Sequence, residues 1–164
     1  MPAPSGDLTA DDAFRALEPV TDPELPFLSV LDLGIVRDVQ VDEAGGVDVA
    51  LTPTYSGCPA TETIDADVAR ALRAAGFASV RVRHVLSPPW TTDWMTERAV
   101  VALKEHGIAP PVSVSGGRFS VAAVACPRCG STDTACITSF GSTACKALYR
   151  CDQCLEPFDH FKCL

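Results

Sequence analysis

Residues 47–72 read V-D-V-A-L-T-P-T-Y-S-G-C-P-A-T-E-T-I-D-A-D-V-A-R-A-L, and this stretch decides the fold of the first part of the chain. Its first part alternates apolar and polar side chains, which is typical of a strand. From Ile64 onward, apolar side chains recur at helical spacing. The change of period falls at Gly57 and Cys58. Because Pro59 suits the first position of a helix, we expect Cys58 at the N-cap.

Segments on either side continue the two patterns. The predicted elements are a helix over 10–17, a helical turn over 27–33, strands over 35–42, 47–54 and 79–86, and a helix between Thr96 and Gly107. Thr9 and Asp12 have the spacing of a capping box at the start of the first helix. The order α-β-β-α-β-α predicts an α+β domain with helices on one face of a sheet.

The end of the chain is rich in cysteine. Seven of the eight cysteines lie in the last 45 residues, and four of them form two C-x-x-C pairs. The four are Cys126, Cys129, Cys151 and Cys154. Each pair lets two thiolates of one tight turn point at one ion, so two pairs predict a closed tetrahedral site. We expect Zn2+, and iron in a rubredoxin-like site uses the same ligands. A disulfide pair or free thiols are the alternative.

These patterns divide the chain into three parts. Residues 1–109 are predicted to form the α+β domain, 110–119 a linker, and 120–164 a cysteine ribbon that binds a metal. A module of about 45 residues buries too little apolar surface to fold alone, so the metal is expected to contribute much of its stability.

Charge and hydropathy exclude several functions. The net charge is −8, and residues 1–119 carry all of it, with nine basic and seventeen acidic side chains. An acidic body repels phosphate backbones, so nucleic-acid binding is disfavoured. The apolar run 119–126 is far too short to span a bilayer, and the first residues do not have the pattern of a secretory signal. We therefore expect a cytoplasmic protein without a membrane partner.

Cys58 is the one cysteine among the first 119 residues. At a helix N-cap its thiolate is expected to form more easily than that of a free cysteine. Such a thiol suits a metal ligand, an acceptor of a persulfide or cluster, or a nucleophile. A nucleophile needs a base, and the candidates in this domain, His84 and His106, have no motif context. Glu62 either contacts Cys58 or complements the helix dipole.

Several motifs resemble known families. T-D-P-E-L-P (21–26), D-L-G (32–34) and T-P-T-Y-S-G-C-P-A-T-E (52–62) resemble the SufT-type domain of iron–sulfur assembly factors. The loop W-T-T-D-W-M (90–95) and the tail from Phe140 to Cys163 resemble the PaaD family, the D proteins of bacterial phenylacetyl-CoA epoxidase systems. The resemblance implies a SufT-like domain followed by a zinc-ribbon-like module.

The resemblance also implies a function. The family is expected not to catalyse epoxidation, but to assist iron–sulfur or metal maturation of the oxygenase and reductase components in aerobic phenylacetate catabolism. The alternative is a zinc-stabilised docking subunit of the epoxidase complex without cluster transfer. A thiol enzyme using Cys58 and a nucleic-acid-binding ribbon are less favoured, because a base and a basic surface are not evident.

Residue roles carry over by position. Cys58 matches the reactive cysteine of the family, and Asp22, Glu24 and Asp32 match its acidic motifs, with Glu62 as a further supporting carboxylate. The candidate ligands for a transient iron–sulfur cluster or a second metal ion are Cys58, Cys145 and Cys163. Cys136 has no counterpart in the family motif, and we expect it to be either a small buried hydrophobe or a spare thiol. Trp90 and Trp94 are candidate partner contacts, and core closure is the alternative.

Overall fold

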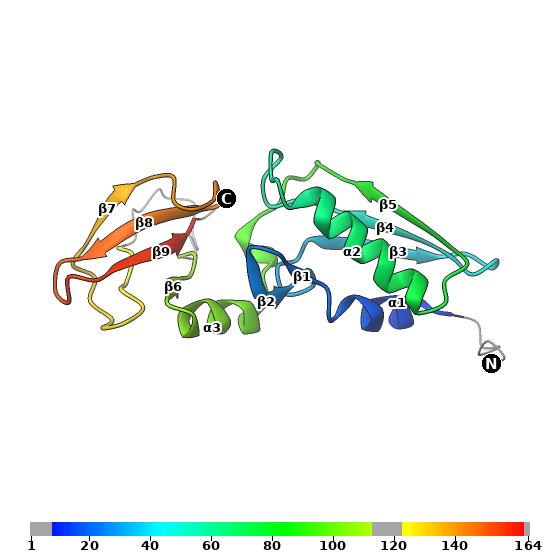
Figure 1. Ribbon diagram of the computed structural model, residues 1–164, viewed down its shortest axis with the longest axis horizontal. Coiled ribbons are helices and arrows are strands. Elements are labelled where there is room, and N and C mark those ends of the chain that lie inside the picture. The colour runs from blue at the N-terminus through cyan, green and yellow to red at the C-terminus, as the bar shows by residue number, and fades with distance from the viewer. Residues whose placement is uncertain (1–7, 113–122, 163–164) are drawn as a thin grey trace. The chain divides into compact units, whose positions relative to one another are not determined.

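The computed structural model describes residues 8–112 and 123–162. The chain forms two compact units, Met1–Trp90 and Thr91–Leu164 (Figure 1). Residues 91–109 pack with the cysteine module, whereas composition placed the boundary after residue 109. Part of the predicted linker lies outside the described residues.

The first unit contains two helices and five strands among its described residues. They are α1 (Ala10–Leu17), β1 (Thr21–Asp22), β2 (Leu25–Ser29), β3 (Val36–Val41), β4 (Gly46–Leu51), α2 (Thr61–Ala74) and β5 (Ser79–His84). The predicted capping box is confirmed, because the Thr9 hydroxyl accepts from the Asp12 N–H while the Asp12 carboxylate accepts from the Thr9 N–H.

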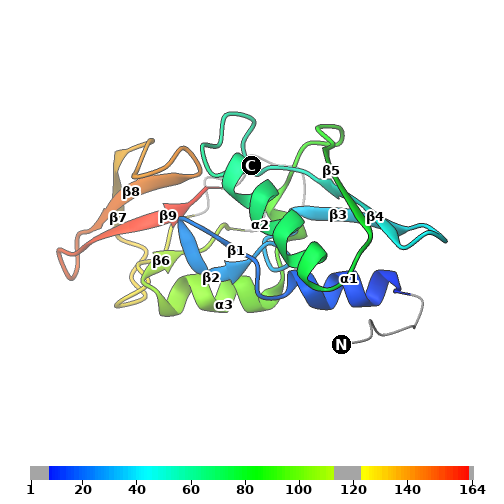
Figure 2. The ribbon, with the colours of Figure 1, turned by 45° about the vertical axis from the view of Figure 1, so that its right-hand side comes forward.

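The sheet of the first unit has the order β3-β4-β5. Strands β3 and β4 form an antiparallel hairpin, and β5 returns through α2 to lie parallel to β4. A parallel return requires a crossover, and α2 supplies it. Helices α1 and α2 lie side by side and contact β3 and β5 respectively (Figures 1 and 2). The α+β layer predicted from the sequence is therefore confirmed.

One prediction for this unit was wrong. The helical turn expected over 27–33 is a strand up to Ser29, followed by turns up to Gly34. Strand β2 pairs with the two-residue strand β1 and forms a short hairpin that the periodicity did not reveal. The hairpin turns at the D-P-E motif, because Oδ1 of Asp22 accepts the N–H groups of Glu24 and Leu25 at 2.7 and 3.1 Å.

The core of the first unit is apolar. Its fully buried large side chains come from α1, the β2 region, β4 and α2, and they include Leu17, Leu28, Val30, Leu33, Val49, Leu51, Val68 and Leu72. Burial of this many branched side chains stabilises the unit without help from cysteine.

The second unit begins with the short 3-10 helix η1 (Thr92–Trp94) and the helix α3 (Glu97–Glu105), which Thr96 caps as predicted. The described residues of this unit form the strands β6 (Ile108–Ala109), β7 (Thr134–Thr138), β8 (Lys146–Cys151) and β9 (Pro157–Phe161). The sheet order is β6-β9-β8-β7, with β6 parallel to β9 and the other pairs antiparallel. Within the described ranges, no helix is long and apolar enough to cross a membrane.

Candidate functional site

The two C-x-x-C turns of the second unit share one backbone design. In the first turn, the Cys126 N–H donates to the Ser131 carbonyl at 2.9 Å, and Gly130 has a φ of 77°. In the second turn, the Cys151 N–H donates to the Glu156 carbonyl at 3.0 Å, and Leu155 has a φ of 63°. Both turns therefore need a left-handed residue directly after the second cysteine.

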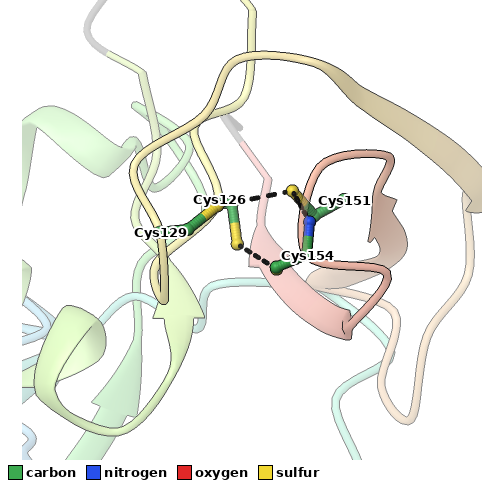
Figure 3. Close-up of side chains that lie close together, drawn as sticks. All are labelled: Cys126, Cys129, Cys151 and Cys154. Atoms are coloured by element: carbon green, nitrogen blue, oxygen red, sulfur yellow. Dashed lines mark hydrogen bonds between the residues drawn. The ribbon is translucent and has the colours of Figure 1, made fainter.

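The four cysteines of these turns converge on one point (Figure 3). Their sulfur atoms all lie within 4.8 Å of one another. The closest pairs join the two turns: Sγ of Cys126 lies 3.7 Å from Sγ of Cys154, and Sγ of Cys129 lies 3.5 Å from Sγ of Cys151. Among the residues that the structure describes, no other group of three or more His, Cys, Asp or Glu side chains converges in this way.

This donor set fits a closed metal site. Four thiols contributed by two tight turns match the ligand count and softness that structural Zn2+ takes, and they leave no position for substrate. Backbone N–H groups already point at the sulfur: the N–H groups of Cys154 and Gln153 lower the pKa of Cys151 to about 7. When bound, the ion would supply cross-linking of the two turns rather than chemistry.

Cysteines outside this group occupy different surroundings. Cys136 is exposed on β7, which rules out the buried alternative and leaves the spare thiol. Cys145 is half-buried directly before β8, with its sulfur 3.0 Å from Oγ1 of Thr143, and its carbonyl accepts the Lys162 N–H. Cys163 lies outside the described residues.

The loop that carries Cys58 differs from the prediction. Helix α2 begins at Thr61 with Ala60 at the N-cap, two residues later than expected. Two successive turns take up the difference: the Cys58 N–H donates to the Tyr55 carbonyl, and the Thr61 N–H donates to the Cys58 carbonyl. The first helical bond joins Ile64 to Ala60. The tight turn at Gly57 thus delays the helix, and Cys58 lies just outside it.

Cys58 lines a pocket of the first unit. The pocket has apolar walls from β4 and α2, and its polar side chains come from the β1–β2 hairpin, the Cys58 loop, α2 and the end of β5. Those polar side chains are Asp22, Thr54, Cys58, Thr61, Asp65 and His84. Elements distant in the sequence thus bring a thiol, two carboxylates and an imidazole to one cavity.

The pKa of Cys58 shifts in the direction opposite to the one expected from the sequence. Burial raises the pKa of the Cys58 thiol, and the carboxylates of Asp22 and Glu24 raise it further. Hydrogen bonds from the Ala60 backbone and the Thr61 side chain oppose this effect without cancelling it. The prediction of an easily formed thiolate was therefore wrong. The thiol lies in an anionic pocket that attracts cations.

The four carboxylates predicted to support Cys58 lie in different surroundings. Asp22 lines the pocket and is buried, and Glu24 acts on Cys58 electrostatically. Asp32 instead closes a local turn, with its Oδ2 accepting from the backbone and hydroxyl of Ser29 at 3.2 and 2.9 Å. Glu62 is exposed in the first turn of α2.

One pair of pocket residues was not singled out from the sequence. Nε2 of His84, at the end of β5, lies 2.9 Å from Oδ1 of Asp65 on α2. The two are 19 residues apart, and only the βαβ crossover brings them together. The helical spacing of Ile64 and Val68 was visible in the sequence, but it did not show which polar neighbour would meet the strand.

Comparison with known proteins identifies the family. Residues 10–83 match the family described as "Iron-sulfur cluster assembly protein", and residues 110–162 match the "PaaD zinc beta ribbon domain". An Escherichia coli (strain K12) relative, named as a putative subunit of 1,2-phenylacetyl-CoA epoxidase, is 51% identical over 153 residues, which are 93% of this chain and 92% of the relative. The chain belongs to the PaaD family.

Two further proteins resemble the first part of this PaaD-family chain. The Fe-S protein maturation auxiliary factor YitW of Bacillus subtilis (strain 168) is 42% identical over 96 residues, which are 57% of this chain and 91% of YitW. The crystal structure of a domain of unknown function, DUF59, from Bacillus anthracis has a TM-score of 0.54 at 34% identity, over 57% of this chain and 89% of that one. The predicted SufT-like domain is therefore confirmed.

The tryptophans of this PaaD-family member differ in exposure. Trp90 is 4% exposed, and its indole N–H donates to the Leu33 carbonyl at 2.8 Å. Trp90 therefore closes the core of the first unit, and its prediction as a partner contact was wrong. Trp94 is half-buried in η1, and its role in partner binding stays a prediction.

Proposed function

We propose that this protein is an accessory maturation factor of a phenylacetyl-CoA epoxidase system in aerobic phenylacetate catabolism. In this proposal Cys58 transiently holds iron or an iron–sulfur cluster that is destined for the oxygenase or reductase components. The ribbon holds a resident Zn2+ and maintains the surface that docks the client. The protein itself catalyses no step of the epoxidation.

The observation that carries this proposal is the pocket of Cys58. A single thiol faces carboxylates in an open, anionic cavity, and the domain around it matches an iron–sulfur cluster assembly family. An anionic cavity with a thiol can take up a metal cation, and its partial exposure lets the cation leave again. The names of the relatives, a component of an epoxidase and maturation auxiliary factors, agree with such a role.

A second candidate function is a docking role without transfer. It is supported by the ribbon, in which four converging thiols form a closed set without an open position. In that case the metal merely holds the second unit in shape, and Cys58 is dispensable.

Substitution of Cys58 separates the two functions. Epoxidase components are produced together with wild-type protein, Cys58→Ser, or no accessory protein, and the iron and sulfide content of the reductase and the epoxidase activity are measured. The maturation proposal expects Cys58→Ser to behave like the absence of the protein, although its zinc content and fold are retained. Full activity with Cys58→Ser contradicts maturation and supports docking.

Two matched variants complete this experiment. Cys136→Ser changes an exposed thiol outside the converging group and is expected to leave maturation unchanged. Cys145→Ser tests the prediction that the Cys145 thiol binds iron during maturation, and the same substitution at Cys163 tests the other candidate. If Cys145→Ser matures the clients fully, Cys145 is not a required ligand.

A further inference from the structure

The donors in the Cys58 pocket do not suit an assembled cluster. Iron–sulfur clusters are held by several thiolates, usually four. Residues 1–119 contain one cysteine, so the first unit of one chain offers one thiolate. The other donors of the pocket are carboxylate oxygens and an imidazole. Such a mixture of one sulfur with oxygen and nitrogen suits a single divalent ion.

Asp22 supplies the first of these further donors. The residue is more than nine-tenths buried, and it lines the pocket with Cys58. Oδ1 accepts two backbone N–H groups of the hairpin, whereas Oδ2 accepts no hydrogen bond from any residue that the structure describes. Among the described residues no fully buried side-chain oxygen lacks a partner, so Oδ2 reaches solvent, and a cation in the pocket can replace water there.

His84 supplies the second donor besides Cys58. Its Nε2 is held by the Asp65 carboxylate at 2.9 Å, which leaves Nδ1 for another contact. A histidine that ligates a metal ion almost always donates its other ring N–H to a carboxylate or carbonyl, which fixes the tautomer and the orientation of the ring. The pair is about one-third exposed, so the pocket is open to exchange on this side.

We infer that the cargo of this pocket is a single ferrous ion, with Cys58, Asp22 and His84 as its donors and Asp65 as the residue that positions His84. The inference rests on the proposed function and specifies its substrate. The thiol proton leaves to solvent when sulfur binds the ion, and no electron is transferred.

The arrangement of the donors fits cargo better than a resident ion. The four ribbon sulfur atoms already converge, whereas the pocket donors do not converge to that degree among the described residues. Binding therefore requires side-chain rotations that bring the donors together, and their reversal releases the ion. A site that must give up its ion gains from such incomplete preorganisation.

The test is a titration of the whole chain with Fe2+ without oxygen, after the ribbon has been loaded with Zn2+. Bound iron and zinc are measured after equilibrium dialysis for wild type, Cys58→Ser, Asp22→Asn, His84→Ala and Asp65→Asn. The control is His106→Ala, which removes an exposed histidine at the end of α3 in the other unit. Circular dichroism and zinc content show whether each variant is folded.

We expect one Fe2+ per wild-type chain, affinity weakened about tenfold or more in His84→Ala and Asp65→Asn, and no change in His106→Ala. Wild-type affinity in His84→Ala or in Asp22→Asn would overturn the inference. It would also be overturned if wild type bound no Fe2+ but accepted a reconstituted cluster on Cys58, and the proposed function would then stand. Full client maturation by Cys58→Ser would instead overturn the proposed function.

Discussion

The two units of this chain use cysteine in opposite ways. The first unit is held together by buried branched side chains such as Leu17, Leu51 and Leu72, and its one thiol lies in an open pocket. The described part of the second unit buries fewer apolar side chains, and one of its buried clusters includes Cys126 and Cys151, which are themselves cysteines of the converging group. A unit with a large apolar core can leave its thiol for chemistry, whereas a unit with a smaller core relies on its thiols for folding.

Removal of a ribbon ligand is expected to have the largest effect on the second unit. We expect Cys151→Ser to lose the metal and to unfold the second unit, because structural Zn2+ contributes on the order of 10 kcal/mol to folding of such modules. The first unit is expected to keep its helices and strands. Amide spectra by NMR and zinc analysis measure both effects, with Cys136→Ser as the matched control. A second unit that stays folded without metal would contradict the account.

A change in the apolar core of the first unit is expected to leave the metal site of the second unit intact. Trp90→Ala is expected to destabilise the first unit by about 3–5 kcal/mol, since it leaves a cavity and removes the donor of the Leu33 carbonyl. The zinc content of the ribbon is expected to stay at the wild-type value. Denaturant unfolding followed in each unit separately measures the change. Equal destabilisation of both units would show that they do not fold independently.

Features of the fold and of the candidate site differ in how well the sequence predicts them. The Thr9–Asp12 capping box and each single C-x-x-C turn are local, because their backbone contacts lie within a few residues. The two turns meet across more than 20 residues, and the preference of one metal ion for four thiolates made that meeting predictable. The two-residue strand β6 was not predicted, and its residues were assigned to the first domain, because its partner β9 lies about 50 residues later. The His84–Asp65 pair depends on the crossover in the same way.

The start of α2 shows a second reason why the sequence alone can mislead, which is that two local signals compete at the same place. Proline at the first helical position is a good local signal, but Ser56 and Gly57 favour a turn at the same place. The turn prevails, and the thiol of Cys58 thereby gains two carboxylate neighbours in place of the full effect of the helix dipole. The direction of its pKa shift therefore depends on tertiary contacts that no local pattern contains.

A smaller effect concerns the pH dependence of the second unit. His160 on β9 is buried, and burial lowers its pKa, although the Ala109 carbonyl near Nδ1 opposes the shift. The unfolded state then binds a proton more readily. The contribution of His160 is fully present above the ordinary histidine pKa of about 6.5 and is lost as the pH falls through the folded value.

Replacement of His160 tests whether this buried histidine makes the stability of the second unit depend on pH. We expect His160→Phe to show a weaker loss of unfolding free energy between pH 7.5 and pH 5 than wild type, at matched zinc content. Denaturant unfolding at several pH values measures the slope. Identical slopes in both proteins would show that His160 does not contribute.

The smallest effect is expected at the second ribbon turn. Leu155 has a left-handed backbone that costs about 1–2 kcal/mol for a residue with a side chain, and its side chain is 70% exposed. Leu155→Gly relieves this strain but adds unfolded-state entropy, so we expect a net stabilisation of about 0.5–1 kcal/mol. Thermal unfolding of the zinc-loaded protein measures the change. A clear destabilisation would mean that Leu155 packs against something in the folded protein.

The central claim is that one chain holds a resident ion in the ribbon and an exchangeable ion beside Cys58. The most direct measurement is the zinc and iron content of wild type and Cys58→Ser, loaded without oxygen and then exposed to a chelator. The account predicts one zinc per chain that resists the chelator in both proteins, and one iron that wild type alone binds and the chelator removes. Iron that is bound equally by Cys58→Ser, or zinc that leaves while the second unit stays folded, would contradict it.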